Sequence, residues 1–140
     1  MGHTQQFWSF RNREVEFFAL EPLITVLERY GCEVGEDAIC WHVATPINES
    51  GNDEIGSEGG IGVVDGKACD FSIDRPYYDE KFFALAADLV CELGLVMFSE
   101  AGTGTYINDA SLQPHIPEDI SLRATVIKSK ADLIAAFDAH

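Results

Sequence analysis

The sequence predicts a single α+β domain, in which about three helices pack on one face of a largely antiparallel sheet. Three observations carry this prediction. The length of 140 residues suits one compact domain. Short segments of alternating apolar and polar residues are separated by turn residues, and apolar residues recur at helical spacing in three longer stretches. No internal repeat or linker interrupts the chain, so the domain is expected to span residues 1–140.

An N-terminal hairpin is the first expected element. Residues 7–11 predict a strand, Asn12 a turn, and residues 13–19 the partner strand. Apolar residues alternate with glutamates in the segment EVEF, which is the period of a half-buried strand. An alternative interpretation is one helix that begins at Glu14 and is kinked at Pro22.

The first helix is expected to begin near Glu21 and to end at Tyr30. Pro22 suits the first turn of a helix, because the N–H that proline lacks has no partner there. Gly31 is a typical stop signal. A further strand is expected at residues 39–44.

Residues 60–73 give the clearest hairpin signal. They contain an Asp-Gly pair, a favoured two-residue turn. The segment CDFSID after the turn alternates apolar and polar residues. We therefore expect Cys69 and Phe71 on the core face of this strand, and Asp70 and Asp74 on the other face.

A second helix is expected from Glu80 to Leu93, with Asp79 as its cap and a broad apolar stripe. The remaining expected elements are a hairpin of residues 95–98 and 105–107, a strand at 122–127, and a helix from Ser129.

The cysteines are expected to be reduced. Three of the four lie inside apolar runs, and no pair has the C-x-x-C spacing of a zinc or redox site. The N-terminal residues lack the apolar region of a secretion signal. No stretch approaches the roughly 20 apolar residues that a membrane span needs. These features predict a cytoplasmic protein, with free thiols at Cys32, Cys40, Cys69 and Cys91.

The net charge of −15 is the strongest single feature of the sequence. It argues against nucleic acid and anionic membranes as partners, because phosphate binding needs Lys and Arg. Between Glu14 and Glu58, eleven acidic residues accompany one basic residue, Arg29. Two interpretations remain open: the charge serves solubility alone, or it steers a basic partner protein to this region.

The expected binding surface combines a loop with the acidic strand face. Residues 46–59 form a long acidic segment that is predicted to be a flexible loop, and long loops in compact domains are often functional. Adjacent tyrosines near this face suit a protein interface, since tyrosine combines a large contact area with a polar tip. The predicted partner-binding residues are Glu49, Asp53, Glu54, Glu58, Asp70, Asp74, Tyr77 and Tyr78.

No catalytic, metal or cofactor site is predicted. Cys40 and His42 would share one side of a strand, but no third group orients them. The glycine-rich segments lack a dinucleotide or P-loop fingerprint, and the acidic loop lacks the glycine and the final glutamate of a calcium loop. With 24 carboxylates, no single pair is informative. We therefore expect a protein that is not an enzyme.

These observations favour an acidic inhibitor or immunity protein, of the kind bacteria use to neutralise a toxin by direct binding. The expected partner is a basic protein. One alternative is a small acidic secretion chaperone or adaptor, which predicts a homodimer with an exposed apolar groove. A second alternative is an enzyme whose site the sequence does not reveal. Monomer and homodimer are both compatible with the sequence.

Overall fold

The computed structural model describes residues 4–36, 40–44, 58–74, 78, 80–99, 104–121 and 123–138. Its elements follow in the order β1 (Gln5–Arg11), β2 (Glu14–Glu16), α1 (Leu20–Arg29), β3 (Glu33–Glu36), β4 (Cys40–Ala44), β5 (Glu58–Val64), β6 (Lys67–Asp74), α2 (Glu80–Leu93), β7 (Val96–Ser99), β8 (Thr105–Ile107), the 3-10 helix η2 (Ala110–His115), β9 (Thr125–Val126) and α3 (Lys130–Asp138). The predicted α+β class is confirmed.

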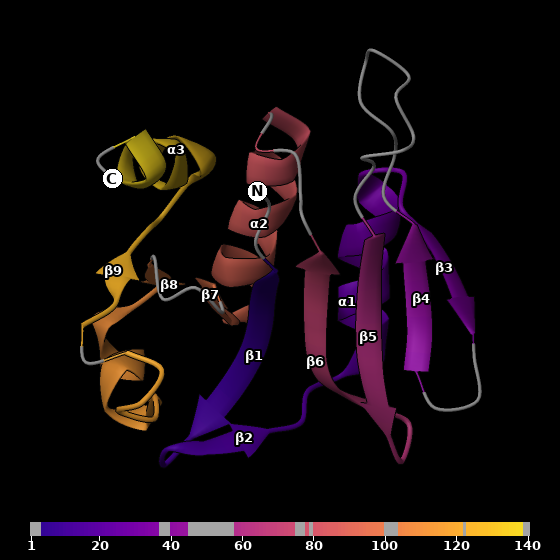
Figure 1. Cartoon of the computed structure of the whole chain (residues 1–140), viewed down its shortest axis with the longest axis horizontal. Helices are drawn as coiled ribbons and strands as arrows, with labels where there is room; N and C mark the ends of the chain where they lie inside the picture. The colour runs from indigo at the N-terminus through magenta and orange to yellow at the C-terminus, as the bar shows by residue number, and fades with distance from the viewer. Residues whose placement is uncertain are drawn as a thin grey trace.

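The strands form one open sheet in the order β3-β4-β5-β6-β1-β7-β8-β9, with β2 paired to the far end of β1. Neighbouring strands run antiparallel except β8 and β9, which are parallel. Figure 1 shows α1 behind β5 and β6, and α2 at the upper end of β1. Side chains of both helices pack in one core with Phe7, Ile61 and Phe71. These two helices therefore cover one side of the sheet.

The N-terminal hairpin is confirmed, and the alternative of a helix beginning at Glu14 is wrong. Phe10 pairs with Val15 across the two strands. The turn places Asn12 at φ 52° and Arg13 at φ 68°. The backbone N–H of Asn12 donates to His115 Nδ1 at 3.0 Å. The hairpin is thereby attached to η2, an element that the sequence did not predict.

The first helix buries one apolar stripe, and its end follows the expected chemistry. Pro22 lies in its first turn. Gly31 adopts φ 78° after the last turn, a conformation that favours glycine, and its N–H donates to Glu28 O at 3.0 Å. The stripe contains Leu23, Val26 and Leu27.

The β5–β6 hairpin is confirmed, but the expected position of Cys69 is wrong. Asp65 and Gly66 form the turn, at φ 52° and 78°. The ladder then shifts, because Gly62 pairs with Asp70 whereas Val63 pairs with Ala68. This β-bulge leaves Cys69 without a cross-strand partner. Fully buried Ala68 takes the core position, and Cys69 is only partly buried.

The C-terminal elements follow the prediction, apart from one strand. The second helix, the β7–β8 hairpin and the last helix are confirmed. Ser129 Oγ accepts a hydrogen bond from the N–H of Asp132 at 3.2 Å, which caps α3. The strand expected at 122–127 contains only Thr125 and Val126, because its ladder with β8 spans two residue pairs.

Strand β3 was not predicted, because EVGE contains a single large apolar residue. Its four residues pair with β4 and form one edge of the sheet.

Two apolar clusters lie on opposite faces of the sheet. The main core joins α1, α2 and α3 to strand residues that include Phe7, Ile61 and Phe71. A smaller cluster contains Phe10 and Ile116, with partly buried Trp8, Phe98 and Leu112 packed against it. Because successive strand residues point to opposite faces, Phe7 and Trp8 belong to different clusters.

Within the described ranges, no helix has both the length and the apolar character of a membrane span. Cys32, Cys69 and Cys91 are free, as expected. A free thiol at Cys40 remains a prediction.

Candidate protein-binding site

The structure describes only some of the predicted site residues. Glu49, Asp53, Glu54 and Tyr77 lie outside the described residues, as does most of the loop at 46–59. The expected loop range overlaps the start of β5, which begins at Glu58.

Three predicted acidic residues lie on neighbouring strands. Glu58 is the first residue of β5, and it pairs with Asp74, the last residue of β6. Asp70 lies four positions before Asp74, so the alternation of the strand places both aspartates on one face. The sheet therefore gathers the aspartates on the face opposite the main core, as the sequence indicated.

Asp70 occupies space that Gly62 leaves open. Its Oδ1 accepts the Gly62 N–H at 3.1 Å and lies 3.5 Å from Cys69 Sγ. A Cβ atom at Gly62 would lie 2.2 Å from the same Oδ1 and 2.6 Å from Cys69 Sγ. A side chain at position 62 would therefore displace this partly buried carboxylate or the Cys69 thiol.

Asp74 is more exposed than Asp70 and belongs to the end of the sheet. Its Oδ1 accepts a hydrogen bond from Thr4 Oγ1 at 3.0 Å. The carboxylate remains in contact with solvent. Asp74 therefore adds negative charge at the rim of the face on which Asp70 lies.

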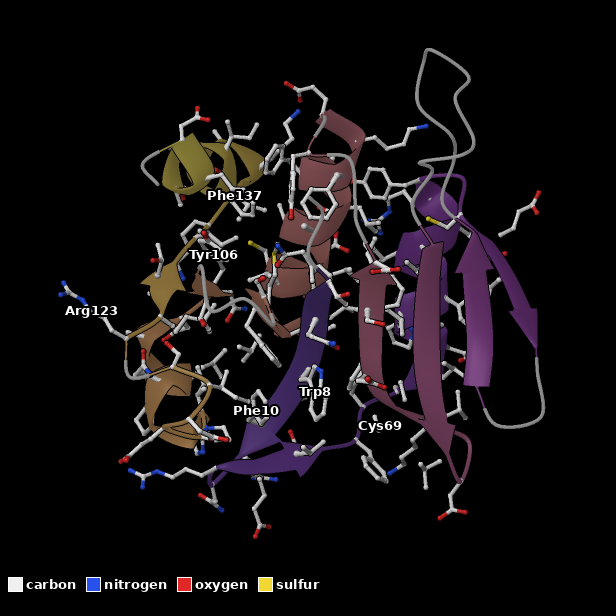
Figure 2. All side chains as sticks on the ribbon, viewed as in Figure 1. Trp8, Phe10, Cys69, Tyr106, Arg123 and Phe137 are labelled. Atoms are coloured by element: carbon white, nitrogen blue, oxygen red, sulfur yellow. The ribbon has the colours of Figure 1, made fainter. Side chains whose placement is uncertain are left out.

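Tyr78 is separated from the aspartates by its packing. Its side chain is 44% exposed. Its ring packs edge-on against Phe82, with centroids 5.3 Å apart, and is tilted against Phe137, with centroids 5.4 Å apart. The hydroxyl accepts a hydrogen bond from Gln5 Nε2 at 3.1 Å. The Tyr78 ring therefore packs against side chains of α2 and α3. It lies near the stacked pair of Tyr106 and Phe137, both labelled in Figure 2.

We call the face opposite the main core, over β1, β6 and β5, the open face. Its central side chains form two rows across the strands, and every member is partly exposed. Gln6 pairs with Ser72, which pairs with Gly60. The adjacent row contains Trp8, Asp70 and Gly62.

Trp8 is held in a fixed position on the open face. Its indole N–H donates to Gln6 Oε1 at 3.0 Å. The ring lies nearly parallel to Phe10, with centroids 5.9 Å apart, and it also contacts Phe98. Figure 2 shows Trp8 on the near side of the sheet, with α1 and α2 behind.

Exposed apolar side chains extend the open face around β2 and the β5–β6 turn. Val15 is opposite Phe10 in the ladder, and it is 42% exposed. Phe18 and Val63 pack on the main core, so Phe17 and Val64 alternate to the open face. These two residues are 45% and 42% exposed. Extended contiguous patches of such side chains, unlike single exposed ones, are typical of a surface that meets a partner.

Four of the described basic side chains pair with carboxylates other than Asp70. Arg29 Nη1 lies 3.0 Å from carboxylate oxygens of both Asp88 and Glu92. Arg11, Arg13 and Lys130 also pair with carboxylates. Across the described chain, none of the ion pairs includes Asp70. The carboxylate of Asp70 is thus not neutralised by a neighbouring cation.

The three described thiols have pKa values raised above the usual value of cysteine. Burial raises the pKa of Cys69, and the neighbouring Asp70 carboxylate raises it further. Burial also raises the pKa of Cys91, and it raises the pKa of Cys32 to about 11. A thiol attacks as its thiolate, so these shifts oppose nucleophilic catalysis. The described residues contain no group of three or more His, Cys, Asp or Glu side chains arranged to hold a metal ion.

A shallow groove of about 720 Å³ lies on the helical side, between α1 and the end of α2. Its lining includes Glu21, Glu28, Glu92 and Arg29. Arg29 is already paired with Glu92, so part of the negative charge of the groove is neutralised. The groove is the competing candidate for a basic ligand.

The sequence did not reveal the apolar part of the open face. Trp8, Phe17 and Val64 were not among the predicted site residues, because an apolar strand residue is more often buried than exposed. The one available signal was the alternation FWSF, which places aromatic residues on both faces of β1.

Comparison with protein-family models, with curated proteins and with solved structures finds no match to this chain.

Proposed function

We propose that this protein binds a basic protein through the open face of its sheet, and that it acts as an inhibitor or immunity protein that neutralises this partner. The observation that carries the proposal is the combination of side chains on that face. Trp8 lies beside Asp70, Phe17 and Val64 extend the face near the β5–β6 turn, and Asp74 lies at the opposite end of β6. No described helix covers these side chains over β5 and β6.

The physical basis of the proposal is a division of roles across the interface. The overall charge of −15 accelerates the encounter with a basic partner. Burial of the apolar side chains then slows dissociation, since a few central aromatic residues carry most of the binding energy in a typical interface. An inhibitor needs no catalytic group, only a stable face.

The test begins with capture and identification of the partner from the native cell, followed by binding kinetics with purified proteins. Replacing Asp70 and Asp74 by Asn removes two charges from the open face. Replacing Glu21 and Glu28 by Gln removes the same charge from exposed positions on α1. We expect the first pair to slow association and to flatten its salt dependence, because exposed charges are screened within about 8 Å at physiological salt. The second pair should change association much less.

A captured partner that is acidic would contradict the proposal, as would equal effects of the two pairs.

The exposed apolar residues Val15, Phe17 and Val64 also favour a second candidate, a small chaperone or adaptor for an export substrate. That function predicts a homodimer that binds an unfolded segment. Sedimentation of the free protein distinguishes the two proposals, because the chaperone is expected to be a homodimer. A monomer, together with binding restricted to a folded basic partner, supports the inhibitor.

A further inference from the structure

We propose that the open face recognises an arginine side chain of the partner, which pairs with Asp70 and stacks against Trp8. This inference rests on the proposed function, and it specifies the chemistry of the same face.

One oxygen of the Asp70 carboxylate is engaged by the protein, and the other is available to a ligand. Its Oδ1 is engaged by the Gly62 N–H and lies near the Cys69 thiol. Within the described structure, no hydrogen bond or ion pair reaches Oδ2. The carboxylate is partly buried and fixed in orientation. A fixed, partly desolvated carboxylate with one free oxygen is an acceptor for a cationic donor.

The surface beside this carboxylate is formed by Gly60 and Ser72. Gly60 pairs with Ser72 two positions along each strand from the pair that Gly62 forms with Asp70, so both pairs lie on the same face. Glycine has no side chain, so the backbone at Gly60 is open to close approach by a flat group. The hydroxyl of Ser72 makes no hydrogen bond within the described residues, and it offers a further acceptor for a guanidinium N–H.

The aromatic ring of Trp8 lies on the other side of Asp70, on the neighbouring strand β1. Phe7 pairs with Phe71, so Trp8 and Asp70 are the next residues of the two neighbouring strands on the open face. The bond from the indole N–H to Gln6 fixes the ring. A cation near an indole ring is attracted by its π-electrons. An arginine extended over the face therefore meets a carboxylate and an aromatic ring together.

These three features favour arginine over lysine. A guanidinium is planar, weakly hydrated and able to donate several hydrogen bonds from one plane, whereas an ammonium is compact and strongly hydrated. Charge complementarity alone would not distinguish the two residues. A preference for arginine is therefore the specific mark of this arrangement.

The experiment uses the full chain and two peptides as probes, hexa-arginine and hexa-lysine, measured by calorimetry at low salt. We expect the arginine peptide to bind roughly fivefold more tightly. Asp70→Asn should remove most of this preference, while it keeps an oxygen that can accept the Gly62 N–H. Glu21→Gln removes one charge from α1 and should leave the preference unchanged.

Variants at Trp8 test the stacking contact separately. Trp8→Leu should weaken the arginine peptide more than the lysine peptide, whereas Trp8→Phe retains a ring and should keep part of the preference. Thermal melting confirms that each variant is folded. Equal affinity of the wild type for both peptides would overturn the inference, and so would an unchanged preference in Asp70→Asn.

The outcome is separable from that of the proposed function. If the native partner needs Asp70 and Asp74 but the two peptides bind equally, arginine recognition is wrong and the proposed function stands. If the native partner binds equally well without Asp70 and Asp74, the proposed function itself fails.

Discussion

The two faces of the sheet are built from alternate residues of the same strands, yet over β1, β5 and β6 they differ in burial and polarity. On the covered face, Phe7, Ile61 and Phe71 are fully buried beneath helices. On the open face, the next residues along the same strands are only partly buried, and they include Trp8 and Asp70. One strand can therefore stabilise the fold with one set of side chains and present a binding surface with the other.

This division has an energetic consequence. Fully burying a large apolar side chain stabilises a protein by about 1.5–3 kcal/mol, whereas surface substitutions usually change stability by about 0.5 kcal/mol or less. Changes on the covered face should thus alter folding. Changes on the open face should mainly alter binding.

The largest expected effect concerns Leu89 of α2, which is fully buried in the main core. Leu89→Ala should lower the free energy of unfolding by about 2–5 kcal/mol, because it leaves a cavity. Phe17→Ala on the open face should lower it by less than about 1 kcal/mol. Urea denaturation measures both values. A similar cost for the two variants would show that the open face is packed against something in the free protein.

A smaller effect is expected at Gly62. Its replacement by Ala places a Cβ against Asp70 Oδ1 and Cys69 Sγ, so we expect a loss of about 1–2 kcal/mol from overpacking. The double variant Gly62→Ala/Asp70→Ala should be less destabilised than the sum of the two single variants. Strict additivity would contradict the placement of the Asp70 carboxylate over Gly62.

The sequence predicted most helices and hairpins of this fold correctly, but it predicted less well which side chains face the core. Turn residues and helical spacing identified the hairpins and the three helices, since these signals are local. The position of Cys69 could not be predicted in this way, because a bulge depends on how two strands pair. Strand β3 was missed for a similar reason, since its few residues form a strand through their pairing with β4.

The candidate site was predictable only in part. Alternation along β6 placed Asp70 and Asp74 on one face, as the structure has them. Trp8 comes from β1, which is distant in sequence, so no local pattern indicates that it lies beside Asp70. Gly62 belongs to the other strand of the predicted hairpin, but its pairing with Asp70 depends on the bulge. Tyr78 was expected beside the aspartates, but its ring packs with Phe82 and Phe137, which lie in α2 and α3.

The smallest expected effect is a pH dependence on the covered side. Burial and, to a smaller extent, the bond from its hydroxyl to Asp88 together raise the pKa of Tyr30 to about 12. The unfolded value is about 10. The folded state thus favours the protonated phenol, so this stabilisation is fully present below pH ~10 and is lost as the pH rises towards ~12.

Tyr30→Phe should therefore reduce the loss of stability between pH ~10 and ~12. Absorbance at the tyrosinate band, followed with urea unfolding at each pH, measures both effects. If the variant shows the same alkaline loss of stability as the wild type, Tyr30 is not protected by the core.

The most direct test of the account is to map which residues respond to a basic ligand. We would record the amide and indole N–H signals of the isotope-labelled protein while hexa-arginine is added. The account predicts the largest shifts at Gly60, Gly62, Asp70 and the indole N–H of Trp8, with little change along α1 and α2. Shifts concentrated at Glu21, Glu28 and Glu92, which line the groove on the helical side, would contradict it.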